Sequence, residues 1–304
     1  MSLIRLENVS VSYGANRALS GVTCLIEGGA VGLLGLNGAG KSTLLKTLLG
    51  FLRPDSGTVE LFGLRLPRHA LRVRQRLGYM PERDVVSPKV SAVSFLSYCG
   101  CLLGMSRVDA MERAHEVLDY VGLGSNRYGK METYSAGARQ RVKFAQSLIH
   151  DPQLLLLDEP TTGLDPGGRV EMLQLIRGLA VGRKVAVLFS SHLLPDIEHV
   201  CDRVIMLHEG KVVQDSRVED LTARREGVYE VQVRDHREGF ARRLIEAGYS
   251  WRAQANGCIL VTQPDERNER ALFEMACAEG TQIRHFRTVR RSLEEAFLRA
   301  IGKE

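Results

Sequence analysis

The chain has 304 residues, of which 44% are hydrophobic, so it can bury one large core or two smaller ones. Its formal net charge of +5 is mild and spread out, and this charge alone gives no reason to expect a nucleic-acid partner. No run approaches the roughly 20 apolar residues that cross a bilayer. Six scattered cysteines, with neither a C-x-x-C pair nor a disulfide-dense spacing, favour reduced thiols in the core or on the surface.

The first 27 residues alternate apolar and polar side chains, which predicts short antiparallel strands. They lack the long apolar core of a secretory signal, and we expect a soluble protein that stays inside the cell. Tyr13 ends the first predicted hairpin strand, where its ring could stack on a flat base. A tyrosine at such a position is more often a turn residue, and both interpretations stay open.

A phosphate-binding pattern, G-x-x-x-x-G-K-[ST], follows a predicted buried strand at 30–34. It consists of Gly35, Leu36, Asn37, Gly38, Ala39, Gly40, Lys41, Ser42 and Thr43. The glycines let backbone N–H groups curve around an oligophosphate, Lys41 adds a positive charge for the terminal phosphates, and the Ser42 hydroxyl can reach Mg²⁺. Leucines at helical spacing follow the pattern and stop near Gly50. A helix N-terminus would therefore point at the anion.

The next segment predicts a turn at 53–57, a strand at 58–63 and another at 76–82, which ends on Glu82. From about residue 88 the composition becomes helical, with amphipathic runs at 90–103 and 108–121. We interpret this part, up to about residue 135, as an inserted helical lobe.

A second helix N-terminus is predicted at Ser135, Ala136 and Gly137, because apolar residues at helical spacing follow these small side chains. Such a helix tip can bind a phosphate. The signal is weak by itself, since serine caps are common.

Four leucines at 154–157 predict a central parallel strand, and Asp158 and Glu159 come directly after them. Downstream of a phosphate-binding loop, this order predicts that Asp158 holds Mg²⁺ and that Glu159 polarises the attacking water. A tight polar loop with Asp165 follows.

A further strand is predicted at 184–190 and leads to Ser191 and His192. Ligands of open parallel sheets gather at the carboxyl ends of the strands, so His192 could reach the same phosphate as Gly35 and Glu159. A hairpin at 203–213 then closes the domain.

The remaining chain, from about residue 227, predicts a strand at 229–233, a helix at 237–247, strands at 250–253 and 258–262, a helix at 267–278, a strand at 281–286 and a helix at 292–301. This order is typical of a small α+β domain of the ferredoxin-like type. A dimerising or regulatory appendage is the favoured interpretation, and a ligand sensor is the alternative.

Residues 3–221 resemble the nucleotide-binding subunit of an ATP-binding-cassette (ABC) transporter. Tyr13 matches the residue that stacks on adenine, Gly35 to Thr43 match Walker A, and Glu82 occupies the glutamine-loop position. Ser135, Ala136 and Gly137 match the signature loop, and Asp158 and Glu159 match Walker B and the catalytic glutamate. Asp165 matches the D-loop, and His192 the switch histidine.

The resemblance implies an α/β P-loop ATPase core at 1–222, with an antiparallel β subdomain and a helical subdomain at about 88–135, followed by a ferredoxin-like domain at 227–304. It implies ATP and Mg²⁺ as cofactors, catalytic roles for Lys41, Glu159 and His192, and Mg²⁺ ligands at Ser42, Glu82 and Asp158. The remaining matched residues would bind nucleotide, and two protomers would sandwich each ATP.

The implied partners are a second nucleotide-binding subunit and an integral membrane permease, which would hold the chain on the inner face of the plasma membrane. The end of the tail, 292–297, resembles subunits of bacterial exporters, and export is our working hypothesis, with import as its alternative. Glu82 replaces the usual glutamine, and Ala136 and Ala138 replace a glycine and usually a glutamine.

The main rival function is that of a soluble ABC ATPase acting on ribosomes or nucleic acid, and no zinc-type cysteines or heptad array favour it. A P-loop kinase would leave the signature loop and His192 unexplained. A scaffold that binds nucleotide without turnover is conceivable because the signature loop is altered, and measured ATP hydrolysis would exclude it.

Overall fold

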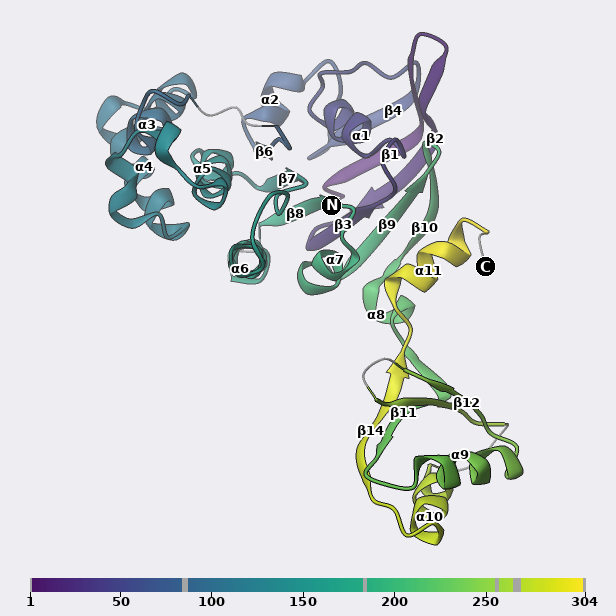
Figure 1. The fold of residues 1–304 in the computed structure, drawn as a ribbon. Helices are drawn as coiled ribbons and strands as arrows, with labels where there is room; N and C mark the ends of the chain where they lie inside the picture. Colours follow the sequence, from purple (N-terminus) through teal and green to yellow (C-terminus); the bar gives the residue numbers. More distant parts are fainter. Residues whose placement is uncertain (1, 84–86, 183–184, 255–256, 265–268, 303–304) are drawn as a thin grey trace. The chain divides into compact units, whose positions relative to one another are not determined.

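The computed structural model describes residues 2–83, 87–182, 185–254, 257–264 and 269–302. They form two compact units, drawn in Figure 1. The first extends to Val218 and includes the end of the chain from Phe297, and the second comprises Glu219–Ala296. The predicted domains, 1–222 and 227–304, place the whole final helix in the second domain, and this assignment stays a prediction. Phe297 of that helix is 6% exposed, so the helix has a buried side, as its apolar spacing predicts.

An antiparallel sheet with the strand order β2-β1-β4-β5 opens the first unit. Its strands are β1 (Ile4–Tyr13), β2 (Asn16–Ile26), β4 (Ser56–Leu61) and β5 (Leu64–Arg65). Irregular registers interrupt the pairing of β1 with β2, and the two strands are longer than the sequence predicted. The hairpin nevertheless confirms the predicted antiparallel subdomain.

The central sheet of the first unit has the strand order β10-β9-β3-β8-β7-β6. Its members are β3 (Ala30–Leu34), β6 (Leu77–Met80), β7 (Leu154–Asp158), β8 (Ala186–Ser191), β9 (Arg203–His208) and β10 (Lys211–Arg217). All pair in parallel except β10, which is antiparallel to β9. Every residue of β3 and β7 is buried, as expected for central parallel strands. The predicted start of β8 at residue 184 lies outside the described residues.

Helix α1 (Lys41–Leu48) packs into a single apolar core that side chains of both sheets share. Four further helices lie in or at the border of this unit: α2 (Ala70–Arg74), α6 (Pro166–Gly182), α7 (Leu194–Val200) and α8 (Val218–Leu221). These four helices were not predicted from the sequence.

The predicted helical lobe is present and contains α3 (Ala92–Leu102), α4 (Arg107–Tyr120), η1 (Gly124–Tyr128) and η2 (Met131–Thr133), and it leads to α5 (Ala136–Leu148). Figure 1 shows α3, α4 and α5 side by side. Three serines cap these helices, Ser91, Ser106 and Ser135, and each accepts a hydrogen bond from the backbone N–H three residues later.

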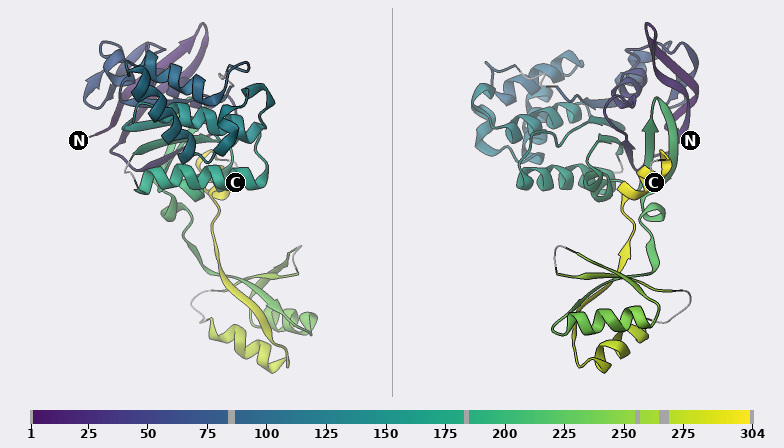
Figure 2. Two further views of the ribbon diagram at one scale, coloured as in Figure 1. Left: turned by 90° about the vertical axis from the view of Figure 1, so that its left-hand side faces the viewer. Right: turned by 45° about the vertical axis from the view of Figure 1, so that its right-hand side comes forward.

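The second unit has a four-stranded antiparallel sheet with the order β12-β13-β11-β14. In chain order its elements are β11 (Arg224–Val233), α9 (Arg237–Glu246), β12 (Ser250–Ala253), β13 (Ile259–Thr262), α10 (Arg270–Ala278) and β14 (Ile283–Arg290), and α11 (Leu293–Ala300) follows. Both helices cover the same face of the sheet (Figure 2). This β-α-β-β-α-β arrangement is ferredoxin-like. The predicted start of α10 at 267 lies outside the described residues.

Among the described helices, none combines the length and the apolar character needed to cross a membrane. All six cysteines are unpaired, and three of them, Cys24, Cys201 and Cys258, are buried. Burial raises the pKa of the Cys24 thiol to about 12, so this side chain stays neutral and behaves as a small apolar residue.

Candidate active site

The carboxyl ends of four neighbouring parallel strands carry the polar residues that the sequence singled out. The P-loop follows β3, Ser191 and His192 come at the end of β8, and Asp158 and Glu159 come at the end of β7. Glu82 follows β6. Because β8 pairs between β3 and β7, His192 lies between the P-loop and Glu159.

A cavity of about 730 Å³ lies at this edge of the sheet. Twelve predicted site residues line it: Tyr13, Leu36, Asn37, Gly38, Gly40, Lys41, Ser42, Thr43, Glu82, Asp158, Glu159 and His192. Its lining also includes Asn16, Arg17, Ala18, Thr162, Glu209 and Gly210, which the sequence analysis did not single out. Arg17 lies opposite Ser12 across the first hairpin, so the predicted strand pairing was the one signal that could have drawn attention to it.

The P-loop is packed tightly against its surroundings. A Cβ on Gly35 would lie 2.6 Å from the Leu207 carbonyl oxygen and 2.9 Å from the Ala39 methyl group. Ala39 is buried, and its carbonyl accepts a hydrogen bond from the Gly210 backbone N–H at 3.1 Å. The close approach fixes the loop, which leads directly into α1 at Lys41. The first N–H groups of α1 therefore face the cavity, as an anion site requires.

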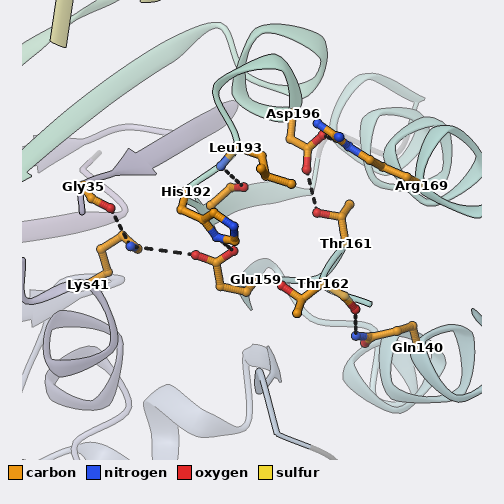
Figure 3. A network of polar contacts seen from close by, with 11 residues as sticks. Gly35, Lys41, Gln140, Glu159, Thr161, Thr162, Arg169, His192, Leu193 and Asp196 are labelled. Atoms are coloured by element: carbon orange, nitrogen blue, oxygen red, sulfur yellow. Dashed lines mark hydrogen bonds and ion pairs between the residues drawn. The ribbon is translucent and has the colours of Figure 1, made fainter. Parts of the chain in front are cut away.

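Lys41, Glu159 and His192 form a chain of polar contacts across the cavity (Figure 3). The Lys41 ammonium group donates to the Gly35 carbonyl oxygen at 2.6 Å and lies 3.8 Å from Glu159 Oε1. The other carboxylate oxygen, Oε2, lies 2.7 Å from His192 Nδ1. Because an ionised carboxylate only accepts hydrogen bonds, Nδ1 carries the proton in this contact. The geometry joins a cation, a general-base candidate and a histidine at one site.

Glu159 has a backbone conformation that few residues other than glycine adopt, with φ of 50°. Its N–H donates to the Ser190 carbonyl at 3.0 Å, and its own carbonyl accepts from the Thr162 N–H at 3.2 Å. A left-handed conformation at a residue with a side chain costs about 1–2 kcal/mol. The turn thus directs a buried carboxylate toward Lys41 and His192 at the expense of backbone strain.

Asp158 is 4% exposed, and its Oδ1 atom has no hydrogen-bond partner among the described residues. Burial raises the pKa of this carboxyl group, the nearby Glu82 charge adds to the shift, and the Ser190 and Ser42 hydroxyls oppose it. Burial together with the charges of Asp158 and Glu82 also raises the pKa of Tyr79 to about 12. An unpaired buried carboxylate oxygen close to a serine hydroxyl fits an Mg²⁺ site, since Mg²⁺ binds oxygen ligands.

The loop that carries Glu82 is held by a buried lysine. Lys143 of α5 is 1% exposed, and its ammonium group donates to the Glu82 carbonyl oxygen at 2.8 Å. The contact links the helix that begins after Ser135 to the segment that follows β6. No sequence pattern singled out Lys143, because lysine is rarely buried.

Ser135, Ala136, Gly137 and Asp165 are not part of the P-loop cavity of this chain. Ser135 and Ala136 are exposed at the start of α5, and Asp165 is exposed just before α6. Ser135, Gly137 and Asp165 line a separate cavity of about 370 Å³. Within one chain these residues are therefore separate from the P-loop cavity, and the expectation that a second protomer supplies them stays a prediction.

The fold and the site together define a P-loop nucleoside triphosphatase. Residues 22–162 match the family model described as ABC transporter. The chain is 34% identical over 303 residues to the uncharacterized ABC transporter ATP-binding protein YxlF of Bacillus subtilis, with 98% of this chain and 99% of the relative covered. It is 31% identical to the Nod factor export ATP-binding protein I of Ralstonia nicotianae, with 99% and 94% covered.

The fold also resembles a solved structure, the dimeric ATP-binding cassette MJ0796 in a post-hydrolysis state with ADP and Pi. The TM-score is 0.65 at 24% identity, and the match covers 71% of this chain and 98% of the other. The chain belongs to the ATP-binding proteins of ABC transporters, and its activity is that of an ABC-type ATPase. The predicted class and architecture of the core are confirmed.

Proposed function

We propose that this chain powers export of a substrate through a membrane permease by binding and hydrolysing ATP between two nucleotide-binding subunits. The observation that carries the proposal is the contact chain from Lys41 through Glu159 to His192 above the P-loop. The three residues join a phosphate-binding cation, a candidate base and a histidine that can sense a terminal phosphate.

Each residue has a chemical role in this proposal. The P-loop N–H groups and Lys41 bind the phosphates, and Tyr13, which is 48% exposed at the cavity, stacks on the adenine. Ser42 and Asp158 would hold Mg²⁺, with Glu82 nearby. The ion neutralises phosphate charge when it is bound. Glu159 orients and deprotonates the attacking water, while His192 fixes the Glu159 carboxylate through its Nδ1–H and faces the phosphate.

Two protomers are needed in this proposal because the exposed Ser135 helix tip and Asp165 lie outside the P-loop cavity of their own chain. A helix N-terminus binds an anion through its free N–H groups, so a triphosphate on one protomer would attract the Ser135 tip of the other. Loss of the terminal phosphate would remove that attraction and let the pair open.

The export direction is supported by the name of a relative that covers nearly the whole chain, a Nod factor export protein. The proposed partner is an integral membrane permease that docks on the helical lobe, which would place this chain on the inner face of the plasma membrane. Within the first unit, the exposed apolar side chains Tyr98, Leu102 and Val108 on that lobe support such a docking surface.

The pairing step is tested with Glu159→Gln, which should bind ATP without turning it over. Light scattering of the purified variant with its copurified permease, or alone, should show paired subunits with ATP and Mg²⁺ and separated subunits with ADP. The control is Ser135→Arg in the same background, which should abolish pairing while ATP still binds. If the subunits paired to the same extent with ATP and with ADP, the proposed mechanism would be refuted. If transport depended on an external solute-binding protein, the chain would power import and the proposed export direction would be wrong.

A further inference from the structure

A carboxylate that the sequence analysis did not select lies completely buried beside the candidate active site. Asp196 on α7 is 0% exposed. Its Oδ2 atom accepts a hydrogen bond from the Thr161 hydroxyl at 2.6 Å, and its Oδ1 atom accepts one from Arg169 Nε at 2.6 Å (Figure 3). A buried charge is tolerated when it is paired and hydrogen-bonded, and here each carboxylate oxygen has its own donor.

The donors of Asp196 come from segments that carry proposed site residues. Thr161 is two residues beyond Glu159, and Asp196 is four residues beyond His192. The Glu159 to His192 contact and the Thr161 to Asp196 contact therefore join the same two segments. Arg169 brings in a third, because it lies in the first turns of α6 and its N–H donates to the Asp165 carbonyl at 2.9 Å.

The contact between Glu159 and His192 needs to be held in place by other residues. The His192 side chain is 49% exposed, so packing alone does not hold its ring in place. Glu159 is in a left-handed conformation, which persists only where the surroundings impose it. The β7 end of the turn is held by Ser190, and the far end, at Thr161, is held by Asp196.

We propose that Asp196 is a positioning residue for ATP hydrolysis, which holds the Thr161 segment and α7 together so that Glu159 and His192 stay in contact. This inference rests on the roles of Glu159 and His192 in the proposed function. Asp196 is not among the described residues that line the cavity, and it acts through the two segments that it joins. Through its hydrogen bond with Arg169, Asp196 also links the start of α6 to the Thr161 segment and α7.

The test is a double-mutant cycle on the full chain, read by single-turnover ATP hydrolysis at saturating ATP. Thr161→Val removes the hydroxyl at nearly constant volume, and Asp196→Asn removes the charge at constant shape. Each should slow hydrolysis by about 10- to 100-fold, since small misplacements of catalytic groups have effects of this size. ATP affinity, measured by titration, should stay within about twofold, and Thr161→Ser should restore the rate, because positioning acts on the reacting geometry and not on ground-state binding.

The same substitutions are then made in the His192→Ala background, where the contact that they support no longer exists. Positioning predicts that Thr161→Val and Asp196→Asn slow hydrolysis by less than about twofold there, because residues that act as a unit are not additive. A merely structural role predicts the full loss in both backgrounds and would overturn the inference. So would rates unchanged by Asp196→Asn.

Two controls separate this inference from the proposed function and from general destabilisation. Asp215→Asn removes an ion pair of the same length, Arg203 to Asp215 at 2.6 Å, whose carboxylate is partly exposed on the β9–β10 hairpin, and should leave the rate unchanged. A rate loss that follows the decrease in melting temperature across all variants would overturn the inference.

The His192→Ala variant separates the inference from the proposed function. If this variant hydrolyses ATP like the parent, the proposed role of His192 is wrong and the inference is wrong with it. If His192→Ala is slow and the cycle is additive, only the inference fails.

Discussion

Gly40 and Gly210 lie against the same backbone atom, the carbonyl oxygen of Ala18. A Cβ on either glycine would lie 2.6 Å from that oxygen, and both residues have positive φ angles, 106° and 74°. The last turn before α1, the β2 strand and the β9–β10 turn therefore meet where only glycine fits. The shape of the P-loop is determined by this contact between distant segments as well as by its own sequence.

Gly210→Ala should disturb the P-loop although residue 210 is far from it in the sequence. We expect about 1–3 kcal/mol of lost stability from overpacking and strain, together with weaker ATP binding. Chemical denaturation and ATP titration measure the two effects. Gly178→Ala in α6 is the matched control, since its Cβ would make an ordinary 3.6 Å contact with the Tyr120 hydroxyl. It should stabilise by about 0.5–1 kcal/mol. ATP binding unchanged by Gly210→Ala would contradict this account.

The sequence was sufficient to predict the local parts of the site. The P-loop pattern lies between a buried strand and an apolar helical repeat, and Asp158 and Glu159 directly follow a leucine-rich strand, so each motif carries its own structural context. The sequence also placed His192 at a strand end. It could not show that β8 pairs between β3 and β7, because strand order depends on contacts between distant segments.

Asp196 and Arg169 show why other parts of the site could not be predicted. A charged residue in a short helix is usually exposed, and only the packing of α7 against α6 shows that this carboxylate is buried and paired. The same limit applies to Lys143, whose buried ammonium group holds the Glu82 segment. Buried polar networks join residues with no common spacing, so no pattern indicates them.

Glu159→Gln should separate ATP binding from ATP hydrolysis. The amide keeps the shape of the side chain and can still accept a hydrogen bond from His192 Nδ1, but it cannot take a proton from water. We expect steady-state hydrolysis to fall by about 10²–10⁴-fold, the usual contribution of a general base, with ATP affinity nearly unchanged. Phosphate release and equilibrium titration measure these quantities. Lys41→Ala should instead lose ATP affinity. Sustained ATP turnover by Glu159→Gln would show that a group other than Glu159 is the general base.

Tyr13→Ala should weaken nucleotide binding through the base and not through the phosphates. Loss of one stacking partner costs about 1–3 kcal/mol in comparable sites. We expect ATP affinity to fall by that amount, while binding of inorganic triphosphate stays unchanged. Tyr13→Phe keeps the aromatic ring and is the matched control, so it should bind ATP like the parent. Equal losses for ATP and triphosphate would show that Tyr13 only supports the hairpin turn.

Asp158→Asn should stabilise the free protein and abolish its response to Mg²⁺. Burial and the neighbouring Glu82 charge raise the pKa of Asp158, so the ionised carboxylate is destabilised in the fold, and a neutral amide avoids that cost. We expect a higher melting temperature without ligands and a loss of Mg²⁺ affinity greater than about 100-fold, since even second-shell changes cost 10- to 100-fold. Thermal unfolding with and without Mg²⁺ tests both effects. A lower melting temperature would show that the Ser190 and Ser42 hydroxyls and the Lys41 charge stabilise the ionised carboxylate more than burial destabilises it.

His150 should make the stability of the first unit depend on pH. Its Nε2 atom lies 3.1 Å from the Leu77 carbonyl oxygen, and its Nδ1 atom has no hydrogen-bond partner among the described residues. Burial lowers the pKa of this histidine, an effect that the Leu77 carbonyl and Asp151 partly oppose, and Arg113 adds a small decrease. Below the ordinary pKa of about 6.5, the unfolded chain therefore binds a proton that the folded chain does not, and stability must fall as the pH falls through that value.

His150→Gln removes this dependence while its amide can still donate to Leu77. The free energy of unfolding, measured by urea denaturation between pH 7.5 and pH 5.5, should decrease less in the variant than in the parent. All other titrating groups are common to both proteins, so the difference between the curves isolates His150. Parallel curves would mean that the histidine binds protons equally well in the folded and unfolded chains, and that burial of this ring has no effect on its charge.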